Sequence, residues 1–418
     1  MKDNKIIFGT LIVLLLLLTV GLSYAYFSTA VKGNDNAKDV VVEAGTLKLT
    51  YTDGPAINTQ YIKPGWSTTK EVSVKNNGTL DAYYNVIWQS LTNGITNDEL
   101  VLSATCQRLN ASGTVEGTCE SISQAPISDM TIAKKISIES GITHKYTFTI
   151  LFLNKNYSQN YNQGKEFNGV LGIEEYVSTQ FEKDDWSTIV ANVKSGNISD
   201  YNIGDTKEVN LGTTYGTHTL RIANTSTPSE CSTTGFSQTA CGFVLEFADI
   251  ITTHNMNPKG EYKGTTYNNG WNVDGWPASS MYTFVNNDIY NAIPSEIKNA
   301  IIDTTVVSGH GKGDTKNFTS TDKLYLLAPK EIYIDWSNDY DTAKDLMRTL
   351  DYYTNIGVTT SNYSGTIKKN GTSAAAWWWL RSAYSNSNSS FYIVRSGGDW
   401  GGYLASLTNG VAPAFRLG

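Results

Sequence analysis

Between about residues 38 and 177 the sequence alternates repeatedly between apolar and polar residues with a period of two. Successive side chains of a β-strand point to opposite faces of a sheet, so this period predicts strands with one buried face. Turn residues such as Asn76, Asn77 and Gly78 separate the alternating runs, and a helical period is almost absent. Short strands between such turns predict an all-β sandwich. The runs are residues 40–51, 71–74, 81–88, 146–152 and 167–177.

The length of the chain predicts more than one folded unit. At 418 residues it exceeds an ordinary single domain, and its 40% hydrophobic content is sufficient for buried cores. Only 17% of the residues are charged, and Gly, Asn, Ser, Thr and Tyr are abundant, which is typical of β-rich extracellular proteins. The net charge of -7 and the lack of a Lys and Arg cluster exclude a nucleic-acid partner, because binding to a phosphate backbone needs such a cluster.

Residues 1–25 have the three parts of an export signal. Lys2 and Lys5 precede an apolar run over residues 6–22, and residues 23–25 supply a small-x-small cleavage site. An uncleaved membrane anchor is the alternative, because the apolar run approaches the ~20 residues that span a bilayer. We therefore expect an N-terminal signal helix and a secreted or cell-surface protein.

The four cysteines form two close pairs, Cys106 with Cys119 and Cys231 with Cys241. In an exported protein, two local disulfides are the first interpretation. A metal site is the alternative, but neither pair has the C-x-x-C spacing of zinc sites. Each disulfide would close a short loop, so we expect it to hold a local excursion of the chain.

The pattern changes after the sandwich, which we expect at residues 26–178. Residues 179–204 are polar and are interpreted as a linker with a short helix. Residues 205–418 combine strands and helices, which predicts a second domain of the α+β class. Strand signals lie near residues 203–211, 220–223, 243–250 and 324–327, and helical spacing covers residues 281–293 and 294–302.

The first part of the chain carries motifs of a known family: the apolar segment running into Ala25-Tyr26-Phe27, the strand opening Ala44-Gly45-Thr46-Leu47, and Lys63-Pro64-Gly65 leading to Val74-Lys75-Asn76-Asn77-Gly78. These motifs resemble the camelysin and TasA-type family of Gram-positive biofilm-matrix proteins. The resemblance implies a signal peptide removed by a dedicated peptidase and a jelly-roll-like sandwich.

Some members of that family are described as metalloproteases. A zinc protease of the common kind needs two histidines one helical turn apart and a glutamate base. The histidines here are His144, His218, His254 and His310, and no H-E-x-x-H sequence occurs. No Cys-His pair, Ser-His-Asp spacing or phosphate-binding loop can be assembled either. The sequence therefore predicts a protein that is not an enzyme.

The second domain carries an ordered series of weak motifs: Gly270-Trp271-Asn272, residues 282–293, Pro294-Ser295-Glu296-Ile297, residues 322–327, Trp379-Leu380-Arg381-Ser382 and residues 410–417. The series resembles the C-type-lectin-like fold, in the version shared with formylglycine-generating enzymes and with domains of clostridial surface proteins. Those enzymes need a reactive cysteine pair late in the domain, and no cysteine follows Cys241.

Calcium-binding lectins of this fold use E-P-N or Q-P-D sequences, and neither occurs here. Asp335, Asp339 and Asp399 remain as oxygen ligands for calcium, although solvated turn residues are the simpler interpretation. We therefore expect no cofactor.

Residues 377–418 interleave a scaffold with a contact set. Trp379, Leu380, Val411, Phe415 and Leu417 belong to the scaffold. Strand alternation predicts Trp379 inside and Trp378 exposed, and Arg381 and Arg416 are expected to bind carboxylates or backbone carbonyls. Tyr, Ser, Gly and Asn between scaffold residues are typical of paratopes. The predicted ligand-binding residues are Tyr384, Ser385, Asn386, Ser387, Asn388, Ser390, Tyr392, Asp399, Trp400, Tyr403 and Asn409.

Residues 384–409 resemble the variable region of a target protein of a diversity-generating retroelement, in which the adenines of Asn codons are randomised. Such codons never yield Lys, Glu, Gln or Met, and none of these occurs between Ala383 and Gly410. Trp400 cannot arise in this way, so it belongs to the fixed skeleton. A plain Gly-, Asn- and Ser-rich hairpin connection is the alternative.

The sequence thus predicts an exported receptor or adhesin of a Gram-positive bacterium. Its second domain would recognise a protein or glycan on another cell or phage surface. The alternative is a structural biofilm-matrix or fibre subunit, in which the sandwich forms a homopolymer by strand addition at its edges.

Overall fold

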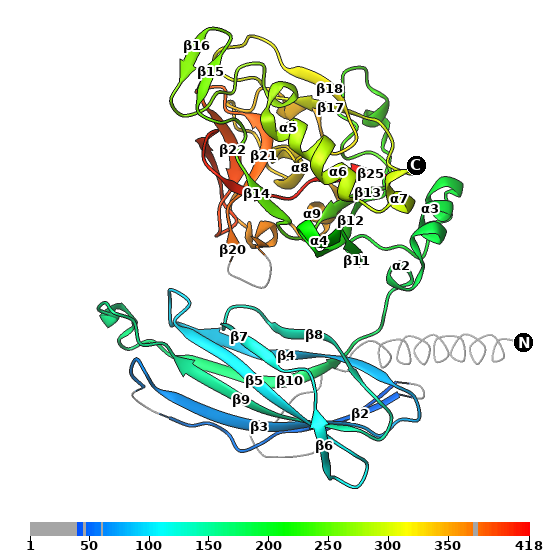
Figure 1. Cartoon of the computed structure of the whole chain (residues 1–418), viewed down its shortest axis with the longest axis vertical. Helices are drawn as coiled ribbons and strands as arrows, with labels where there is room; N and C mark the ends of the chain where they lie inside the picture. Colours follow the sequence, from blue (N-terminus) through cyan, green and yellow to red (C-terminus); the bar gives the residue numbers. More distant parts are fainter. Residues whose placement is uncertain (1–39, 45–46, 60–61, 371–374) are drawn as a thin grey trace, which may run out of the picture. The chain divides into compact units, whose positions relative to one another are not determined.

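The computed structural model describes residues 40–44, 47–59, 62–370 and 375–418. The predicted export segment, residues 1–25, lies outside these ranges. The chain divides into two compact units, residues 1–177 and 178–418. Most regular structure is β-sheet, as the sequence predicts, and the helices are short (Figure 1). In the described part of the chain no helix is long and apolar enough to cross a membrane.

The first unit consists of two antiparallel sheets. One sheet has the strand order β1-β2-β3-β9-β5-β6, with β7 also paired to β5, and the other has the order β10-β4-β8. The strands are β1 (Val40–Ala44), β2 (Leu47–Thr52), β3 (Ser67–Asn76), β4 (Ala82–Asn93), β5 (Leu100–Leu109), β6 (Val115–Thr118), β7 (Ile122–Pro126), β8 (Thr131–Ile138), β9 (Thr143–Phe152) and β10 (Phe167–Glu175).

A single core joins these sheets. Along β9 every second residue is buried, so Tyr146 and Phe148 lie inside while Thr147 and Thr149 are partly exposed. Tyr84 and Trp88 of β4 enter the same core from the smaller sheet. The period of two thus places one face of each sheet in a shared interior, which is a sandwich.

One buried carboxylate fastens the long connection between β9 and β10. Glu99 accepts hydrogen bonds from the side-chain amides of Gln159 and Asn162, each at 2.7 Å, and from the hydroxyls of Tyr157 and Tyr161. Burial raises the pKa of Glu99, but these four donors outweigh burial and hold the pKa below its usual value. The connection is therefore anchored in the sandwich despite its polar sequence.

The second unit contains a four-stranded sheet, β11-β12-β13-β25, and a five-stranded sheet, β14-β24-β21-β22-β23. The final strand, β25, pairs with β13, so the first and last strands of the unit belong to the same sheet. The strands are β11 (Thr206–Asn210), β12 (Thr217–Asn224), β13 (Val244–Phe247), β14 (Thr252–His254), β15 (Gly260–Tyr262), β16 (Thr265–Tyr267), β17 (Thr304–Ser308), β18 (Phe318–Asp322), β19 (Lys368–Lys369), β20 (Ala375–Ala376), β21 (Trp378–Ala383), β22 (Ser390–Val394), β23 (Trp400–Leu404), β24 (Asn409–Val411) and β25 (Ala414–Arg416).

Short helices cover these sheets: α2 (Gln180–Lys183), α3 (Trp186–Ser195), α4 (Gly212–Tyr215), α5 (Ser280–Phe284), α6 (Tyr290–Ala292), α7 (Ser295–Lys298), α8 (Pro329–Ile332) and α9 (Asp351–Asn355). The expected linker at residues 179–204 is wrong in one respect. Phe181 of α2 and Ile189 of α3 are fully buried in the core of the second unit, because both helices are amphipathic. This segment is therefore part of the folded unit.

Two further local expectations are corrected. The predicted helix at residues 281–293 is divided, because a π-helical turn at Val285–Ile289 separates α5 from α6. The predicted strand at residues 324–327 is fully buried but makes only a single bridge, between Tyr325 and Ala414. Burial was correctly expected there, but burial alone does not distinguish a strand from an irregular core segment.

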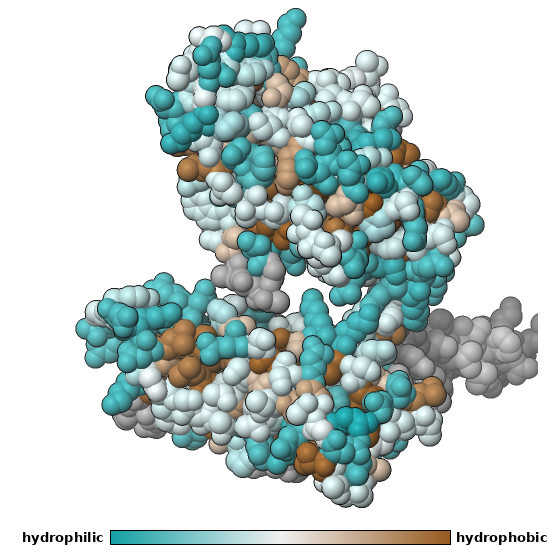
Figure 2. Space-filling model, in the orientation of Figure 1, coloured by the Kyte–Doolittle hydropathy of each residue, from teal (hydrophilic) through white to brown (hydrophobic). Residues whose placement is uncertain are grey.

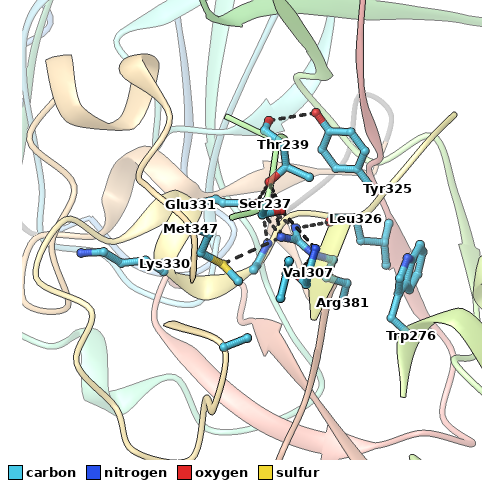
Figure 3. A network of polar contacts seen from close by, with 12 residues as sticks. Ser237, Thr239, Trp276, Val307, Tyr325, Leu326, Lys330, Glu331, Met347 and Arg381 are labelled. Carbon is cyan, nitrogen blue, oxygen red and sulfur yellow. Dashed lines mark hydrogen bonds and ion pairs between the residues drawn. The ribbon is translucent and has the colours of Figure 1, made fainter. Parts of the chain in front are cut away.

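A buried ion pair connects distant segments of the second unit (Figure 3). Arg381 of β21 binds Glu331 of α8 through two hydrogen bonds of 2.6 Å, and both side chains are fully buried. The guanidinium also donates to the backbone carbonyls of Val307, at 3.1 Å, and Leu326, at 2.8 Å. Thr239 donates to the same carboxylate. The expectation that Arg381 binds carboxylates and carbonyls is confirmed.

Removing one partner of this pair should strongly destabilise the second unit. Arg381→Met leaves Glu331 as an uncompensated buried charge, which costs about 3–5 kcal/mol. The double variant Arg381→Met, Glu331→Met should recover part of that loss. Urea unfolding measures both values.

The matched control is Arg395→Met, since Arg395 and Asp399 form an ion pair whose side chains are 41% and 36% exposed. Exposed pairs contribute below about 1 kcal/mol. If Arg381→Met unfolded at the same urea concentration as the control, the buried pair would not hold the unit together.

Candidate functional site

The predicted contact residues lie on and around the five-stranded sheet of the second unit. Its central strand β21 is buried along its whole length, and β22 is buried as well. Trp378 was expected to be exposed, but it is as fully buried as Trp379. Its indole nitrogen donates to the carbonyl of Thr366 at 3.1 Å, and that of Trp379 donates to the carbonyl of His254 at 2.9 Å. The strand is covered on both faces, so alternation does not apply to it.

A buried asparagine holds the loop at residues 384–389, which connects β21 to β22. The side-chain amide of Asn272 donates to the backbone carbonyls of Ser387 at 2.9 Å and Ser390 at 2.7 Å. Its backbone N–H donates to the carbonyl of Asn388 at 2.9 Å. Asn272 is fully buried, whereas the side chains of Asn386 and Asn388 are exposed. The loop backbone is thus fixed while its side chains face solvent.

The structure divides the predicted contact residues between the two faces of β23. A side chain at Gly402 would meet the ring of Tyr384 at 3.4 Å, and one at Gly401 would meet the guanidinium of Arg395 at 2.5 Å. Neighbouring strand residues point in opposite directions, so these two groups lie on opposite faces. Tyr384 and Trp400 therefore belong to one face, and Tyr403 belongs to the other.

Tyr340, which the sequence analysis missed, completes the first face. Its ring centroid lies 5.1 Å from that of Tyr384, and its carbonyl accepts the N–H of Ser385 at 3.2 Å. At 43% exposure it is the most exposed large apolar side chain in the described part of the second unit. We call Tyr340, Tyr384, Asn386, Asn388 and Trp400 the tyrosine face. On the side of the second unit that Figure 2 shows, hydrophobic residues are scattered among polar ones.

Two predicted contact residues are wrong. Tyr392 is fully buried and Ser390 is 8% exposed, because β22 lies between β21 and β23 under core side chains. The Tyr392 ring packs 5.1 Å from Tyr384, 6.0 Å from Trp400 and 5.5 Å from Trp336. Tyr392 therefore supports the tyrosine face from below.

The remaining predicted residues occupy other places. On the second face of β23, the ring of Tyr403 packs 4.8 Å from that of Trp377. Asp399 forms an ion pair with Arg395, and Asn409 pairs with His254 in the sheet. The hydroxyl of Ser387 is 3.1 Å from that of Ser390, which places it within the loop. Ser385 is half-buried beside Tyr340.

The three aspartates considered for calcium do not form a cluster. Asp335 accepts hydrogen bonds from the backbone N–H and the hydroxyl of Thr360. The side chain of Asp339 is 98% exposed, and Asp399 is bound to Arg395. In the described ranges the only group of three potential metal ligands is Cys106, Cys119 and His144, in the first unit. There the two cysteines form one of the two predicted disulfides, and Cys231–Cys241 forms the other.

A buried carboxylate lies below the tyrosine face. Asp341 is fully buried, directly after Tyr340, and accepts a hydrogen bond of 3.1 Å from the indole of Trp336. Burial raises the pKa of Asp341 to about 6, although Arg381 and hydrogen bonds oppose this.

This shift predicts a pH-dependent stability. Because the pKa is raised in the folded protein, Asp341 does not destabilise the fold below about pH 4, where it is protonated in both states. Its destabilising effect grows as the pH rises and is complete above about pH 6. Asp341→Asn removes the charge, so it should raise the unfolding free energy relative to wild type by about 3 kcal/mol at pH 7.5 and by much less at pH 4. Urea unfolding across this range measures the difference. Exposed Asp339→Asn is the control, and a pH-independent effect of Asp341→Asn would contradict the prediction.

Comparisons with known proteins match separate parts of the chain. Residues 248–418 match a family described as a domain of unknown function, DUF6273. Residues 5–97 match a family described as camelysin metallo-endopeptidase. No curated protein matches the chain. The second match confirms the resemblance of the first part of the chain to camelysin.

This match also corrects the sequence analysis. The expectation that the protein is not an enzyme is contradicted, because the matching family is described by a peptidase activity. A metallo-endopeptidase implies a metal, and the described ranges offer one group of ligands for it. In that group the sulfur atoms of Cys106 and Cys119 are bonded to each other. The disulfide form therefore does not fit a metal ion, since thiolates are the ligands that zinc requires from cysteine.

Proposed function

We propose that this protein is displayed outside the cell and binds a protein or glycan through the tyrosine face of its second unit. The observation that supports this most directly is the exposure of Tyr340 beside Tyr384, next to two exposed asparagines. Tyrosines provide a large contact area at a low cost in conformational entropy, and asparagines adapt their hydrogen bonds.

The rigidity of the face supports the same proposal. Asn272 holds the backbone of residues 384–390, and Tyr392 and Trp336 form an aromatic floor. A pre-organised surface loses little entropy on binding. Substitutions of the exposed side chains leave these supports in place.

We further propose that the second unit has a C-type-lectin-like fold and that residues 384–409 vary under a diversity-generating retroelement. The absence of Lys, Glu, Gln and Met from this segment supports the proposal. A template repeat that matches the 3′ end of the gene and differs from it only at adenines, near a reverse transcriptase gene, is the expected observation. A gene neighbourhood without such a repeat would contradict it.

Binding can be tested with the labelled full chain. We expect it to bind intact cells of some bacterial strains, or a subset of an array of bacterial glycans, in flow cytometry or array scans. The triple variant Tyr340→Ala, Tyr384→Ala, Asn388→Ala should reduce that binding at least tenfold, because aromatic anchors dominate interface energies.

The control is Asn299→Ala, Asn355→Ala, which changes exposed residues of the same unit away from the face. Circular dichroism should show both variants folded, since surface substitutions cost little. Equal binding by the triple variant and the control would contradict the proposal. Filaments that sediment from the wild-type chain would instead favour the fibre subunit. It would grow from β8 and β10, each of which pairs with β4 alone among the described residues.

Peptide hydrolysis is a second candidate function, because residues 5–97 match the metallo-endopeptidase family. We expect the full chain to cleave casein, and a chelator such as phenanthroline to abolish the cleavage. Gel electrophoresis with and without the chelator measures this. Intact casein after prolonged incubation with added zinc, under both oxidising and reducing conditions, would rule this function out.

A further inference from the structure

Three side chains with metal-binding atoms meet inside the first unit. Cys106 lies in β5, Cys119 follows β6, and His144 lies in β9. One ligand atom from each lies within 4.8 Å of the other two. Cys106 and His144 are 2% and 4% exposed, whereas Cys119 is half-buried. The group is therefore shielded on the core side and open to solvent at Cys119.

The hydrogen bonds of His144 leave one ring nitrogen for a ligand. Nδ1 lies 2.8 Å from the hydroxyl of Tyr84, which lies 2.9 Å from the hydroxyl of Tyr146. If Nδ1–H donates to Tyr84 and Tyr84 donates to Tyr146, Nε2 keeps its lone pair. Metal-bound histidines in proteins have the same arrangement, with the second nitrogen held by a hydrogen bond.

Charged side chains of both signs surround the group. Arg108 lies opposite His144 in the sheet and forms ion pairs with Glu116 and Glu139. Lys145 directly follows His144 and pairs with Glu71.

We propose that reduction of the Cys106–Cys119 disulfide by a dithiol creates a site for a divalent cation of the zinc type, with Sγ of Cys106, Sγ of Cys119 and Nε2 of His144 as ligands. The disulfide takes up two electrons and two protons from the dithiol, which is itself oxidised to a disulfide. Binding of the cation then releases the two thiol protons to solvent.

Little movement is needed to form this site. Two thiolates on one tetrahedral zinc ion lie about 3.7 Å apart, since each Zn–S bond is about 2.3 Å long. Cys119 can supply this separation, because it lies beyond the end of β6 and is half-exposed. The three residues then have two alternative states, one with the disulfide and one with a bound zinc ion. Three protein ligands leave a fourth position open to water.

This inference does not depend on the tyrosine face, which belongs to the other unit. It gives the metal implied by the family match a place among the described residues, although Cys106, Cys119 and His144 follow the matched segment, residues 5–97. The second disulfide, Cys231–Cys241, provides an internal comparison, because no third ligand accompanies it in the described ranges.

The experiment uses the full chain, reduced with a phosphine under anaerobic conditions and titrated with Co²⁺ and then Zn²⁺. We expect one Co²⁺ per chain with a thiolate charge-transfer band, displaced by Zn²⁺, and no band from the oxidised protein. The variant Cys231→Ser, Cys241→Ser should keep the band, and Cys106→Ser, Cys119→Ser should lose it. His144→Asn should weaken Co²⁺ binding at least tenfold. A reduced chain with four titratable thiols and no band would overturn the proposal.

A second measurement needs no variant. When the reduced protein is reoxidised in air, Zn²⁺ should slow re-formation of Cys106–Cys119 at least tenfold and leave Cys231–Cys241 unaffected, as measured by mass spectrometry of alkylated peptides. Equal effects of Zn²⁺ on the two pairs would contradict the proposal even if His144→Asn failed to fold.

Discussion

The second unit depends on the ion pair between Arg381 and Glu331. Its segments are short, and an ordinary apolar core does not fix the course of irregular chain between them. Arg381 in the central strand binds the carboxylate of α8 and the carbonyls of Val307 and Leu326, while Thr239 reaches the same carboxylate from another loop. Leaving any of these buried charges unpaired is unfavourable, so the pairing favours the arrangement in which these segments meet. The interaction thus helps to hold β21 in place, and with it the loop that follows.

The position of the tyrosine face depends in turn on the position of β21. β21 ends at Ala383, and Asn272 then fixes the next turn of the chain by binding three of its carbonyls. Gly311 allows this, because a side chain there would lie 2.3 Å from the Asn272 amide oxygen. The backbone of the loop is consequently decided by buried groups that contact no ligand. The side chains of residues 386 and 388 are exposed, so substitutions there leave the hydrogen bonds of Asn272 in place.

The sequence predicted the parts of the structure that depend on local pattern. The alternation at residues 146–152 corresponds to β9 with every second residue buried, and the cysteine spacing correctly indicated two local disulfides. Arg381 was recognised as a structural residue. Each of these signals lies within a few neighbouring residues, where a period or a spacing has a direct physical meaning.

The errors have a common cause in long-range packing. Trp378 and Tyr392 are buried because β21 and β22 are covered on both faces, and no period distinguishes such strands from half-exposed ones. Tyr340 was missed because it is 44 residues from Tyr384 in the sequence, and only the fold brings their rings to 5.1 Å. The sequence could not place His144 beside Cys106 and Cys119, because only the pairing of β5 with β9 brings the histidine to the disulfide.

Burial also limits which residues of the C-terminal segment can define a ligand preference. Every residue of β21 and β22 is buried, so changes of side chain in these strands would mainly alter the core. Exposed positions lie in the loop at residues 384–389, in the turn around Ser396, at Gly402 and at residues 407–408. These positions are separated by scaffold residues only one or two places away in the chain. The exposed side chains of such a surface can be replaced while the hydrogen bonds of Asn272 and Arg381 remain intact. A binding face that varies without unfolding requires that the residues that contact a ligand differ from the residues that hold the fold.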